Sequence, residues 1–458
     1  MKVPATIFRE YDIRGTVGDQ LTAEVAQAVG TAFATVAWER LGAAPRIAVG
    51  RDNRPSGAAL SAALRDGLVD GGAVATDIGE LPTPALYFAT HTLDVDGGVQ
   101  VTGSHNPPEF NGLKLVLRGE AVYGAGIQRL RQLLEDNLAA TRVGGRHAAR
   151  AGVLAHYRDA ITGKNGPLPR RVKAVVDCGN GVTSLVAIET LRQLGAEIVP
   201  LFCESDGRFP NHHPDPTVLE NLRDLQATVR RSGAELGIAF DGDGDRIGAV
   251  DEAGRVVFGD QLLVLFGRDL VRRMGPGHAV IFDVKCSAVL PQELARAGLK
   301  PTMWKTGHSL IKEKMRELGA PLAGEMSGHM FFGGDWYGFD DALFAAARLL
   351  RYVAEQGGPL SRLLADLPAT VSTPEMRIAC PDERKFDVVA RAARYFAARY
   401  QVSTLDGVRI SFPDGWGLLR ASNTQPVLVL RFEAASDATL RAYQVEVEDW
   451  LRAEGVAP

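Results

Sequence analysis

The sequence lacks the features that would place this protein in a membrane, on a nucleic acid or outside the cell. The longest mostly apolar stretch of its 458 residues, 25–38, is interrupted by Gln, Gly and Thr and is too short to span a bilayer. The 51 basic and 55 acidic residues form no block of one sign, so neither nucleic acid nor an anionic membrane is expected as the main partner. The N-terminus is charged where a signal peptide needs an apolar run. We therefore expect a soluble, cytoplasmic protein.

Cysteine is also scarce, with four residues and no Cys-x-x-Cys pair. This scatter favours free buried thiols in a reducing compartment over disulfides or zinc ligands. The positions are Cys178, Cys203, Cys286 and Cys380. The remaining composition, 46% apolar and 23% charged, is that of a globular protein, and the length allows about three or four domains.

A strand–helix–strand pattern recurs three times along the chain. An apolar β-run, a helix closed near its end by Gly and a second β-run follow one another, which is typical of a mixed or parallel sheet covered by helices. The expected elements are 46–52, 58–69 and 73–78; 173–178, 182–194 and 196–202; and 278–284, 287–297 and 299–304. A different, α+β stretch follows, with helices at 386–400 and 438–454 and strands at 407–412, 418–421 and 427–434.

Segments typical of turns and linkers separate these units, at 141–150, 163–169, 251–255 and 356–359. We therefore predict four domains, of which the first three are related mixed-sheet α/β domains and the last is α+β. The predicted domains are 1–147, 148–251, 252–363 and 364–458.

Ser104 stands in the turn Val-Thr-Gly-Ser-His-Asn-Pro (101–107), directly after an apolar strand. Glycine, asparagine and proline in this turn favour unusual backbone angles and prevent a simple helical continuation. A polar turn is one interpretation. The other is a phosphoserine, because a hydroxyl displayed between His105 and Lys114 can carry a phosphoryl group.

Three aspartates, Asp241, Asp243 and Asp245, alternate with glycine in Phe-Asp-Gly-Asp-Gly-Asp-Arg (240–246). Carboxylates this close repel one another unless a cation is bound, and an all-oxygen ligand set favours Mg²⁺ over Zn²⁺. An EF-hand would place its ligands at the same positions, with Glu252 as the twelfth residue. However, Arg246 stands at the sixth position, where that loop needs Gly. The flanking residues also predict strands rather than helices.

Further polar motifs lie in the second half of the chain. Gly-Glu-Met-Ser-Gly-His (324–329) puts Glu325 and Ser327 on alternate residues, so both can face a sugar, and a solvated loop is the alternative. Arg-Ala-Ser-Asn-Thr-Gln-Pro (420–426) combines a guanidinium with small polar groups that suit a phosphate, unless it is only a polar hairpin turn. Two basic residues follow strands of the third unit, at the edge where α/β proteins bind ligands: Lys285 and His308.

In their order along the chain, these motifs resemble those of the α-D-phosphohexomutase superfamily, and most closely its bacterial phosphomannomutase/phosphoglucomutase group. The similarity runs the whole length and also includes Phe-Arg-Glu-Tyr-Asp-Ile-Arg-Gly (8–15). It implies a heart-shaped protein of four domains, with one loop from each domain at a central cleft. It also implies an isomerase of carbohydrate metabolism, which interconverts the 1- and 6-phosphates of mannose and glucose through a phosphoserine and a hexose 1,6-bisphosphate.

The resemblance assigns a role to each matched residue. Ser104 would carry the phosphoryl group and, with Asp241, Asp243 and Asp245, would hold Mg²⁺. The other catalytic residues would be Arg14, Lys114, Arg246, His308 and His329. The substrate would be bound by Tyr11, His105, Lys285, Gly307, Glu325, Met326, Ser327, Gly328, Arg420, Ser422, Asn423, Thr424 and Gln425. The implied cofactors are Mg²⁺ and hexose 1,6-bisphosphate, as intermediate and activator, and the implied partners are phosphosugars bound to a monomer.

Three alternatives stay open. Phosphoglucosamine mutases resemble this chain but usually carry Ala where Gly244 stands, and Ala or Ser where Gly103 stands before the phosphoserine. A metal-dependent sugar phosphatase would release inorganic phosphate. A silent phosphosugar-binding protein would have a disrupted serine or aspartate loop, and both loops are intact here. Gly103, Gly244 and Met326 favour the mannose/glucose group.

Overall fold

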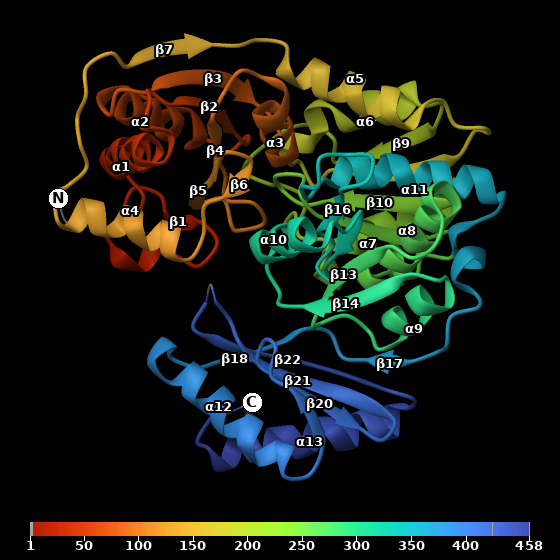
Figure 1. Cartoon of the computed structure of the whole chain (residues 1–458). Coiled ribbons are helices and arrows are strands. Elements are labelled where there is room, and N and C mark those ends of the chain that lie inside the picture. The colour runs from red at the N-terminus through yellow and green to blue at the C-terminus, as the bar shows by residue number, and fades with distance from the viewer. Residues whose placement is uncertain (1–2, 424, 458) are drawn as a thin grey trace. The chain divides into compact units, whose positions relative to one another are not determined.

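The computed structural model describes residues 3–423 and 425–457. They form two compact units, Met1–Phe266 with Ser327–Leu364, and Gly267–Met326 with Ala365–Pro458. Figure 1 shows the helices and strands of both. No helix in the described part of the chain is long and apolar enough to cross a membrane.

The first unit begins with a mixed sheet. Its strands are β1 (Ile13–Thr16), β2 (Arg46–Arg51), β3 (Val74–Glu80), β4 (Gly97–Val101), β5 (Phe110–Leu117), β6 (Glu120–Ala121) and β7 (Arg146–Ala149). They lie in the order β1-β5-β4-β2-β3-β7, with β6 beside β5. β2 pairs in parallel with both β3 and β4, whereas β5 is antiparallel to β4 and β1. The accompanying helices are η1 (Ala5–Ile7), α1 (Ala23–Leu41), α2 (Gly57–Asp70), α3 (Thr83–Thr92) and α4 (Ala125–Glu135).

Helices α1 and α2 approach so closely that only glycine fits at their contact. A Cβ on Gly67 would lie 1.8 Å from the carbonyl oxygen of Gln27, and one on Gly30 would lie 2.3 Å from that of Leu64. Apolar side chains of these helices and of the sheet form one continuous core. This packing holds β2 and β4, whose carboxyl ends carry part of the candidate site, in a fixed position.

A second sheet in the first unit repeats the parallel centre. Its strands are β8 (Lys173–Asp177), β9 (Glu197–Leu201), β10 (Leu236–Phe240), β11 (Ile247–Asp251) and β12 (Val256–Val257), in the order β12-β11-β10-β8-β9. β8 is parallel to β9 and β10, and β11 is antiparallel to β10. The other elements of the unit are α5 (Val153–Asn165), η2 (Val182–Leu185), α6 (Ala187–Gln193), η3 (Leu219–Leu222), α7 (Arg223–Ser232), β16 (Met330–Phe332), α11 (Ala342–Gln356) and η4 (Leu360–Leu364).

The helix predicted at 182–194 is wrong in its first part. Residues 182–185 form the 3-10 turn η2, and α6 begins only after Val186, whose φ of −139° and ψ of −27° are not helical. The N–H of Val182 donates a hydrogen bond to the carbonyl oxygen of Gly242, 3.1 Å away. We attribute the break to this contact, which draws the first turn toward the aspartate loop. The strands predicted on both sides of that loop are confirmed as β10 and β11, which agrees with the rejection of an EF-hand.

The second unit contains a parallel sheet and an antiparallel one. The chain enters the unit within α8 (Gly259–Met274). The parallel strands are β13 (Ala279–Asp283), β14 (Lys300–Trp304) and β15 (Leu322–Gly324), with β13 between the other two, and the helices are α9 (Val289–Arg296) and α10 (His308–Leu318). The antiparallel strands are β17 (Val371–Ser372), β18 (Met376–Ala379), β19 (Gln401–Ser403), β20 (Val408–Phe412), β21 (Gly415–Ala421) and β22 (Val427–Ala434).

Two helices cover one face of the antiparallel sheet, α12 (Asp382–Ala397) and α13 (Asp437–Ala453) (Figure 1). Their buried side chains, among them Phe396 and Trp450, pack with Phe432 of β22 in one core. This arrangement confirms the predicted α+β character of the C-terminal region.

The three parallel sheet centres share one strand order. In each, the first strand lies between the second and the third: β3-β2-β4, β9-β8-β10 and β14-β13-β15. The prediction of three related α/β regions is therefore confirmed. The third strand of each set, β4, β10 or β15, ends just before a predicted functional loop. These loops contain Ser104, the aspartates from Asp241 onward, and Glu325.

Candidate active site

Ser104 lies on a strained turn after β4. Its φ is +51°, in the left-handed region that residues other than glycine rarely adopt. The residue is only 2% exposed. Its N–H donates to Thr102 Oγ1 at 2.8 Å, and its hydroxyl donates to Asp241 Oδ2 at 2.9 Å and lies 3.1 Å from His105 Nδ1. The neighbouring groups thus hold the Ser104 backbone in an unfavourable conformation. In this conformation its hydroxyl faces Asp241, the first aspartate of the aspartate loop.

A buried guanidinium, that of Arg54, organises the same turn. Arg54 pairs with Asp52 at 3.2 Å, and Asp52 also accepts hydrogen bonds from Thr102 Oγ1 and the Gly103 N–H. The guanidinium donates to backbone carbonyl oxygens 2.6–3.0 Å away, those of Ser104, Asn106, Pro107 and Phe110. Because the guanidinium donors have a fixed geometry, these bonds together fix the path of the turn.

The aspartate loop wraps around its own first carboxylate. Asp241 Oδ1 accepts hydrogen bonds of 2.9–3.1 Å from three backbone N–H groups, those of Gly244, Asp245 and Arg246. The loop touches the Ser104 turn so closely that a Cβ on Gly242 would lie 2.4 Å from the carbonyl oxygen of Ser104. Thr83 Oγ1, from the start of α3, donates to Asp243 Oδ2 at 2.6 Å. All three carboxylates are fully buried.

Lys114 brings positive charge into this cluster. Its ammonium donates to Asp243 Oδ2 at 2.8 Å and to Asp245 Oδ2. Burial lowers the pKa of Lys114, but the two carboxylates outweigh that effect and raise the pKa well above its usual value. Burial, together with the charges of Asp245 and Asp243, raises the pKa of Asp241 well above its usual value. The positive charges of Lys114 and Arg246 therefore face three buried carboxylates.

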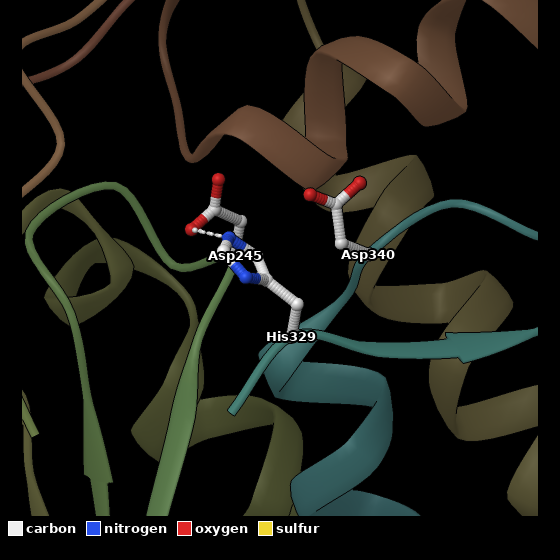
Figure 2. Close-up of side chains that lie close together, drawn as sticks. All are labelled: Asp245, His329 and Asp340. Carbon is white, nitrogen blue, oxygen red and sulfur yellow. Dashed lines mark ion pairs between the residues drawn. The ribbon is translucent and has the colours of Figure 1, made fainter. Parts of the chain in front are cut away.

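His329 joins the cluster from the loop before β16. Figure 2 shows His329 facing Asp245, with Asp340 beside them. His329 Nε2 lies 3.4 Å from Asp245 Oδ1, and a ligand atom of each of the three residues lies within 4.8 Å of the others. Arg246 Nε donates to His329 Nε2 at 3.3 Å, and Ser327 Oγ lies 3.1 Å from His329 Nδ1. Burial and the positive charges of Arg246 and Arg14 lower the pKa of His105 well below its usual value.

The second unit holds another set of predicted residues. Glu325 is buried, and its Oε1 accepts a hydrogen bond of 2.6 Å from the Gly307 N–H, at the start of α10. Asp283, at the end of β13, accepts from the Met326 N–H at 3.0 Å and from Thr306 Oγ1 at 2.9 Å. The loops after β13, β14 and β15 are thus hydrogen-bonded to one another.

The basic residues of this set have acidic partners. Lys285 Nζ donates to Glu375 Oε2 at 3.2 Å. Arg420 lies 3.1 Å from Asp406, whose Oδ2 also accepts from the Thr306 N–H at 3.0 Å. These contacts connect the loop after β14 with the strand that precedes the predicted phosphate loop.

Lys385 supports the phosphate loop from α12. Its buried ammonium donates to the carbonyl oxygens of Ser422 and Gln425, at 2.5 and 3.0 Å. The N–H of Gln425 donates in turn to Ser422 Oγ at 3.1 Å. The same ammonium pairs with Asp382 Oδ1 at 2.6 Å, so its main effect is to fix the backbone of the loop.

Comparison with known proteins gives one consistent result. Family models of phosphoglucomutase/phosphomannomutase match four segments: alpha/beta/alpha domain I at 5–138, domain II at 155–254, domain III at 258–371 and the C-terminal domain at 375–449. A phosphomannomutase/phosphoglucomutase of Pseudomonas aeruginosa is 47% identical over 456 residues, which cover 98% of this chain and 96% of that protein. The chain belongs to this family.

Further relatives agree with this membership. A phosphoglucomutase of Neisseria gonorrhoeae is 44% identical over 96% of this chain and 95% of its own length. The crystal structure of a phosphoglucomutase/phosphomannomutase family protein from Burkholderia thailandensis aligns with a TM-score of 0.90 and 45% identity, over 99% of this chain and 98% of that one. The four-domain α/β fold of the family is thus the fold of this chain.

The aspartate loop of this family member fits a divalent cation. Carboxylate oxygens of Asp241, Asp243 and Asp245 lie within 4.8 Å of one another. Asp243 Oδ1 is buried and has no hydrogen-bond donor among the described residues. A buried carboxylate oxygen without a donor is costly, and a hard cation would satisfy it. The residues present can therefore hold a metal.

The structure divides the predicted site residues between the two units. The first unit contains Tyr11, Arg14, Ser104, His105, Lys114, Asp241, Asp243, Asp245, Arg246, Ser327, Gly328 and His329. The second contains Lys285, Gly307, His308, Glu325, Met326, Arg420, Ser422, Asn423 and Gln425. Thr424 lies outside the described residues.

Several residues at these clusters were not predicted from the sequence: Asp52, Arg54, Thr83, Asp340, Lys385 and Asp406. A usable signal existed for the first two, because two charges stand directly after the buried strand β2 in Arg-Asp-Asn-Arg (51–54). Charged residues at the carboxyl end of a central strand usually serve a site.

We expect the conservative substitution Arg54→Lys to impair catalysis. An ammonium keeps the charge but cannot reproduce the fork that reaches several carbonyl oxygens at once, so the Ser104 turn should lose its fixed position. Turnover should fall by at least about tenfold, or roughly 1.4 kcal/mol in activation free energy, with a smaller change in KM. Steady-state kinetics measure this effect, and Arg65→Lys on α2, which lies outside the turn, is the matched control. Unchanged kcat in Arg54→Lys would contradict this role.

Proposed function

We propose that this protein is a phosphomannomutase/phosphoglucomutase, which interconverts the 1-phosphates and 6-phosphates of mannose and glucose. The observation that carries the proposal is the position of the Ser104 hydroxyl, 2.9 Å from Asp241 in a buried cluster of three carboxylates. The names of relatives at 44–47% identity, whose lengths are matched almost completely, support it. We further propose the domain boundaries 1–147, 148–251, 252–363 and 364–458. The first boundary falls between two matched family segments, whereas the domain II and domain III segments extend to 254 and 371.

In this proposal, Ser104 carries the phosphoryl group, and Ser104, Asp241, Asp243 and Asp245 hold Mg²⁺. The cation supplies neutralisation of the negative charge on the transferring group. Phospho-Ser104 passes its phosphoryl group to the free hydroxyl of the bound hexose monophosphate, which gives a hexose 1,6-bisphosphate. This intermediate turns end for end, and its other phosphate returns to Ser104. The same bisphosphate activates any unphosphorylated enzyme.

The residues around Ser104 supply charge and proton transfer. When Ser104 attacks a phosphate, its hydroxyl proton has an acceptor at His105 Nδ1, 3.1 Å from the oxygen. Lys114 and Arg246 bring positive charge to the transferring phosphoryl group, and Arg14, held by Asn106 at 2.9 Å, adds a third cation. The proton of the attacking sugar hydroxyl passes to a histidine, and His308 and His329 are the candidates.

The remaining predicted residues bind the sugar and its second phosphate. Glu325 and Ser327 accept and donate hydrogen bonds at the 3- and 4-hydroxyls. The loop from Arg420 to Gln425 binds the phosphate that is not being transferred, supported by the Lys385 ammonium behind it. Tyr11 and Lys285 contact the substrate beside these groups.

Two glycines favour this substrate class over glucosamine phosphates. Phosphoglucosamine mutases usually carry Ala at position 244, and Ala or Ser at 103. Here a Cβ on Gly103 would lie 2.5 Å from Arg54 Cζ, and one on Gly244, at φ +78°, would lie 2.3 Å from Thr183 Oγ1. A side chain at either position would therefore clash with its neighbours, so both positions favour glycine over alanine or serine. Assays with mannose, glucose and glucosamine 1-phosphates, together with a measurement of free inorganic phosphate, separate a mutase from the glucosamine enzyme and from a phosphatase.

We expect similar catalytic efficiencies for mannose and glucose phosphates. The two sugars differ at carbon 2, whereas the proposed contacts of Glu325 and Ser327 are to hydroxyls that both share. The two values of kcat/KM should lie within about tenfold, or roughly 1.4 kcal/mol. Glu325→Gln should reduce both together, and Glu313→Gln on α10 is the control. A thousandfold preference for one sugar, or a Glu325 variant that impairs only one, would refute a shared contact.

A further inference from the structure

Two of the four cysteines, Cys178 and Cys203, lie next to each other, after the neighbouring strands β8 and β9. Their Sγ atoms are 3.3 Å apart, and both residues are free thiols. A disulfide bond is about 2.05 Å long, so bond formation requires the sulfurs to approach by roughly 1.2 Å. Cys178 is buried, but Cys203 is partly exposed, the one cysteine of the four with appreciable access to solvent. A soluble oxidant can therefore reach this pair through Cys203.

The Cys203 sulfur has three close polar neighbours: Cys178 Sγ and the Val176 carbonyl oxygen, each at 3.3 Å, and the Leu201 carbonyl oxygen at 3.2 Å. The hydrogen bond with Cys178 lowers the pKa of the Cys203 thiol, against the opposing effect of burial. The thiolate is the form of cysteine that reacts with peroxides. The two other cysteines, Cys286 and Cys380, are buried.

The turn that begins at Cys178 supports the candidate active site. The Cys178 carbonyl oxygen accepts from the Gly181 N–H at 2.8 Å, and the next N–H, of Val182, donates to Gly242 of the aspartate loop at 3.1 Å. On the other side, Asn53, the neighbour of Arg54, donates its side-chain amide to the Asn180 carbonyl oxygen at 2.7 Å. Movement of Cys178 is thus transmitted to the aspartate loop and to the neighbour of Arg54.

The backbone near both sulfurs is already strained. Asn180 and Phe202 have φ values of +58° and +48°, and the N–H of Asn180 donates to the Phe202 carbonyl oxygen at 2.8 Å. The two segments that carry the cysteines are therefore hydrogen-bonded to each other, so any backbone shift that accompanies a new covalent bond between them acts on this turn.

We propose that Cys178 and Cys203 are a redox modification site, which hydroperoxides convert into a disulfide that lowers the catalytic activity of the enzyme. The Cys203 thiolate attacks one peroxide oxygen, the O–O bond breaks, and the sulfur becomes a sulfenic acid while the other oxygen leaves as water or an alcohol. The Cys178 sulfur then attacks the Cys203 sulfur, the S–O bond breaks, and the oxygen leaves as water with the Cys178 proton. Two thiols and one hydroperoxide give one disulfide, one molecule of water and one molecule of the corresponding alcohol; with hydrogen peroxide both product molecules are water. A dithiol reverses the modification.

The test uses the full-length, Mg²⁺-loaded enzyme and hydrogen peroxide. Thiols counted after unfolding should fall from four to two per chain, and peptide mapping should show one linked pair, 178 with 203. Over the same time course kcat/KM should fall by about tenfold or more, because a displacement of about one ångström at a positioning group can cost on the order of a hundredfold. Dithiothreitol should restore both values.

Three variants make the test specific. Cys203→Ser and Cys178→Ser should resist inactivation by peroxide, whereas Cys380→Ser should lose activity like the unmodified chain. Should Cys178→Ser fail to fold, Cys203→Ser alone decides. Four remaining thiols, isolated sulfinic acids, a different linked pair, or a 178–203 disulfide with unchanged kcat/KM would each overturn the proposal. The thiol count does not depend on the mutase assay, so this outcome is separate from that of the proposed function.

Discussion

Ser104→Ala should lower turnover by several orders of magnitude while the fold stays intact. The hydroxyl is the proposed carrier of the phosphoryl group, and among the described residues it is the hydroxyl that donates to Asp241, so the variant should have no route to the phosphoenzyme. The substitution removes only the side-chain hydroxyl. The backbone carbonyl oxygen of residue 104, which accepts a hydrogen bond from Arg54, is still present, and the backbone φ of +51° should be retained. Kinetics with glucose 1-phosphate measure the loss, and intact-mass analysis should show one phosphoryl group on a fraction of the native chain and none on the variant.

The control for this experiment is Ser232→Ala, in the last turn of α7, whose Oγ donates to the Val229 carbonyl oxygen of the same helix. It should retain both activity and the phosphorylated fraction. Full activity of Ser104→Ala, or a phosphoryl group mapped to another peptide, would refute Ser104 as the carrier.

Removal of the metal should abolish activity reversibly, and Asp243→Asn should weaken metal binding. The cluster holds three buried carboxylates against the positive charges of Lys114 and Arg246, so it is short of positive charge until a cation binds. Chelation should stop turnover, and Mg²⁺ should restore it and raise the melting temperature by mass action. In Asp243→Asn, Lys114 keeps Asp245 as its partner. The metal-free variant should therefore melt no lower than the native metal-free protein, while its kcat/KM falls at least about a hundredfold, or roughly 2.7 kcal/mol.

Asp136→Asn, an exposed residue at the end of α4, is the matched control and should change neither property. Full activity after exhaustive chelation would exclude a required metal. A metal-induced rise in melting temperature that is as large in Asp243→Asn as in the native chain would show that the cation binds elsewhere.

The strand–helix–strand pattern of the sequence predicted most of the fold, because apolar runs and helix-ending glycines are local signals. The C-terminal strands at 407–412 and 427–434 match β20 and β22 closely. The helix at 182–194 was wrong in its first part because its first N–H group is bound by Gly242, sixty residues further along the chain. No local pattern encodes such a contact.

In the candidate site, too, the sequence predicted the residues that belong to local motifs and missed those that act through long-range contacts. Ser104 and the three aspartates stand in short contiguous motifs, which can be recognised from the sequence. Arg54, Thr83 and Lys385 act on loops far from them in sequence, and each is an ordinary residue of a turn or a helix until the chain folds. Arg54 is the clearest case, because its importance lies in the carbonyl oxygens around it and not in any pattern of side chains.

The shared order of β3-β2-β4, β9-β8-β10 and β14-β13-β15 means that Ser104, Asp241 and Glu325 occupy equivalent topological positions. One strand order, used three times, thus places the proposed phosphoryl carrier in the first copy, the proposed cation ligands in the second and the proposed sugar-binding carboxylate in the third. The three sheets differ in their outer strands, but the parallel centre and the position of the loop after its third strand are shared. That junction is consequently the natural place to exchange loops in an engineered phosphosugar enzyme, because the backbone there has already accommodated three unrelated tasks.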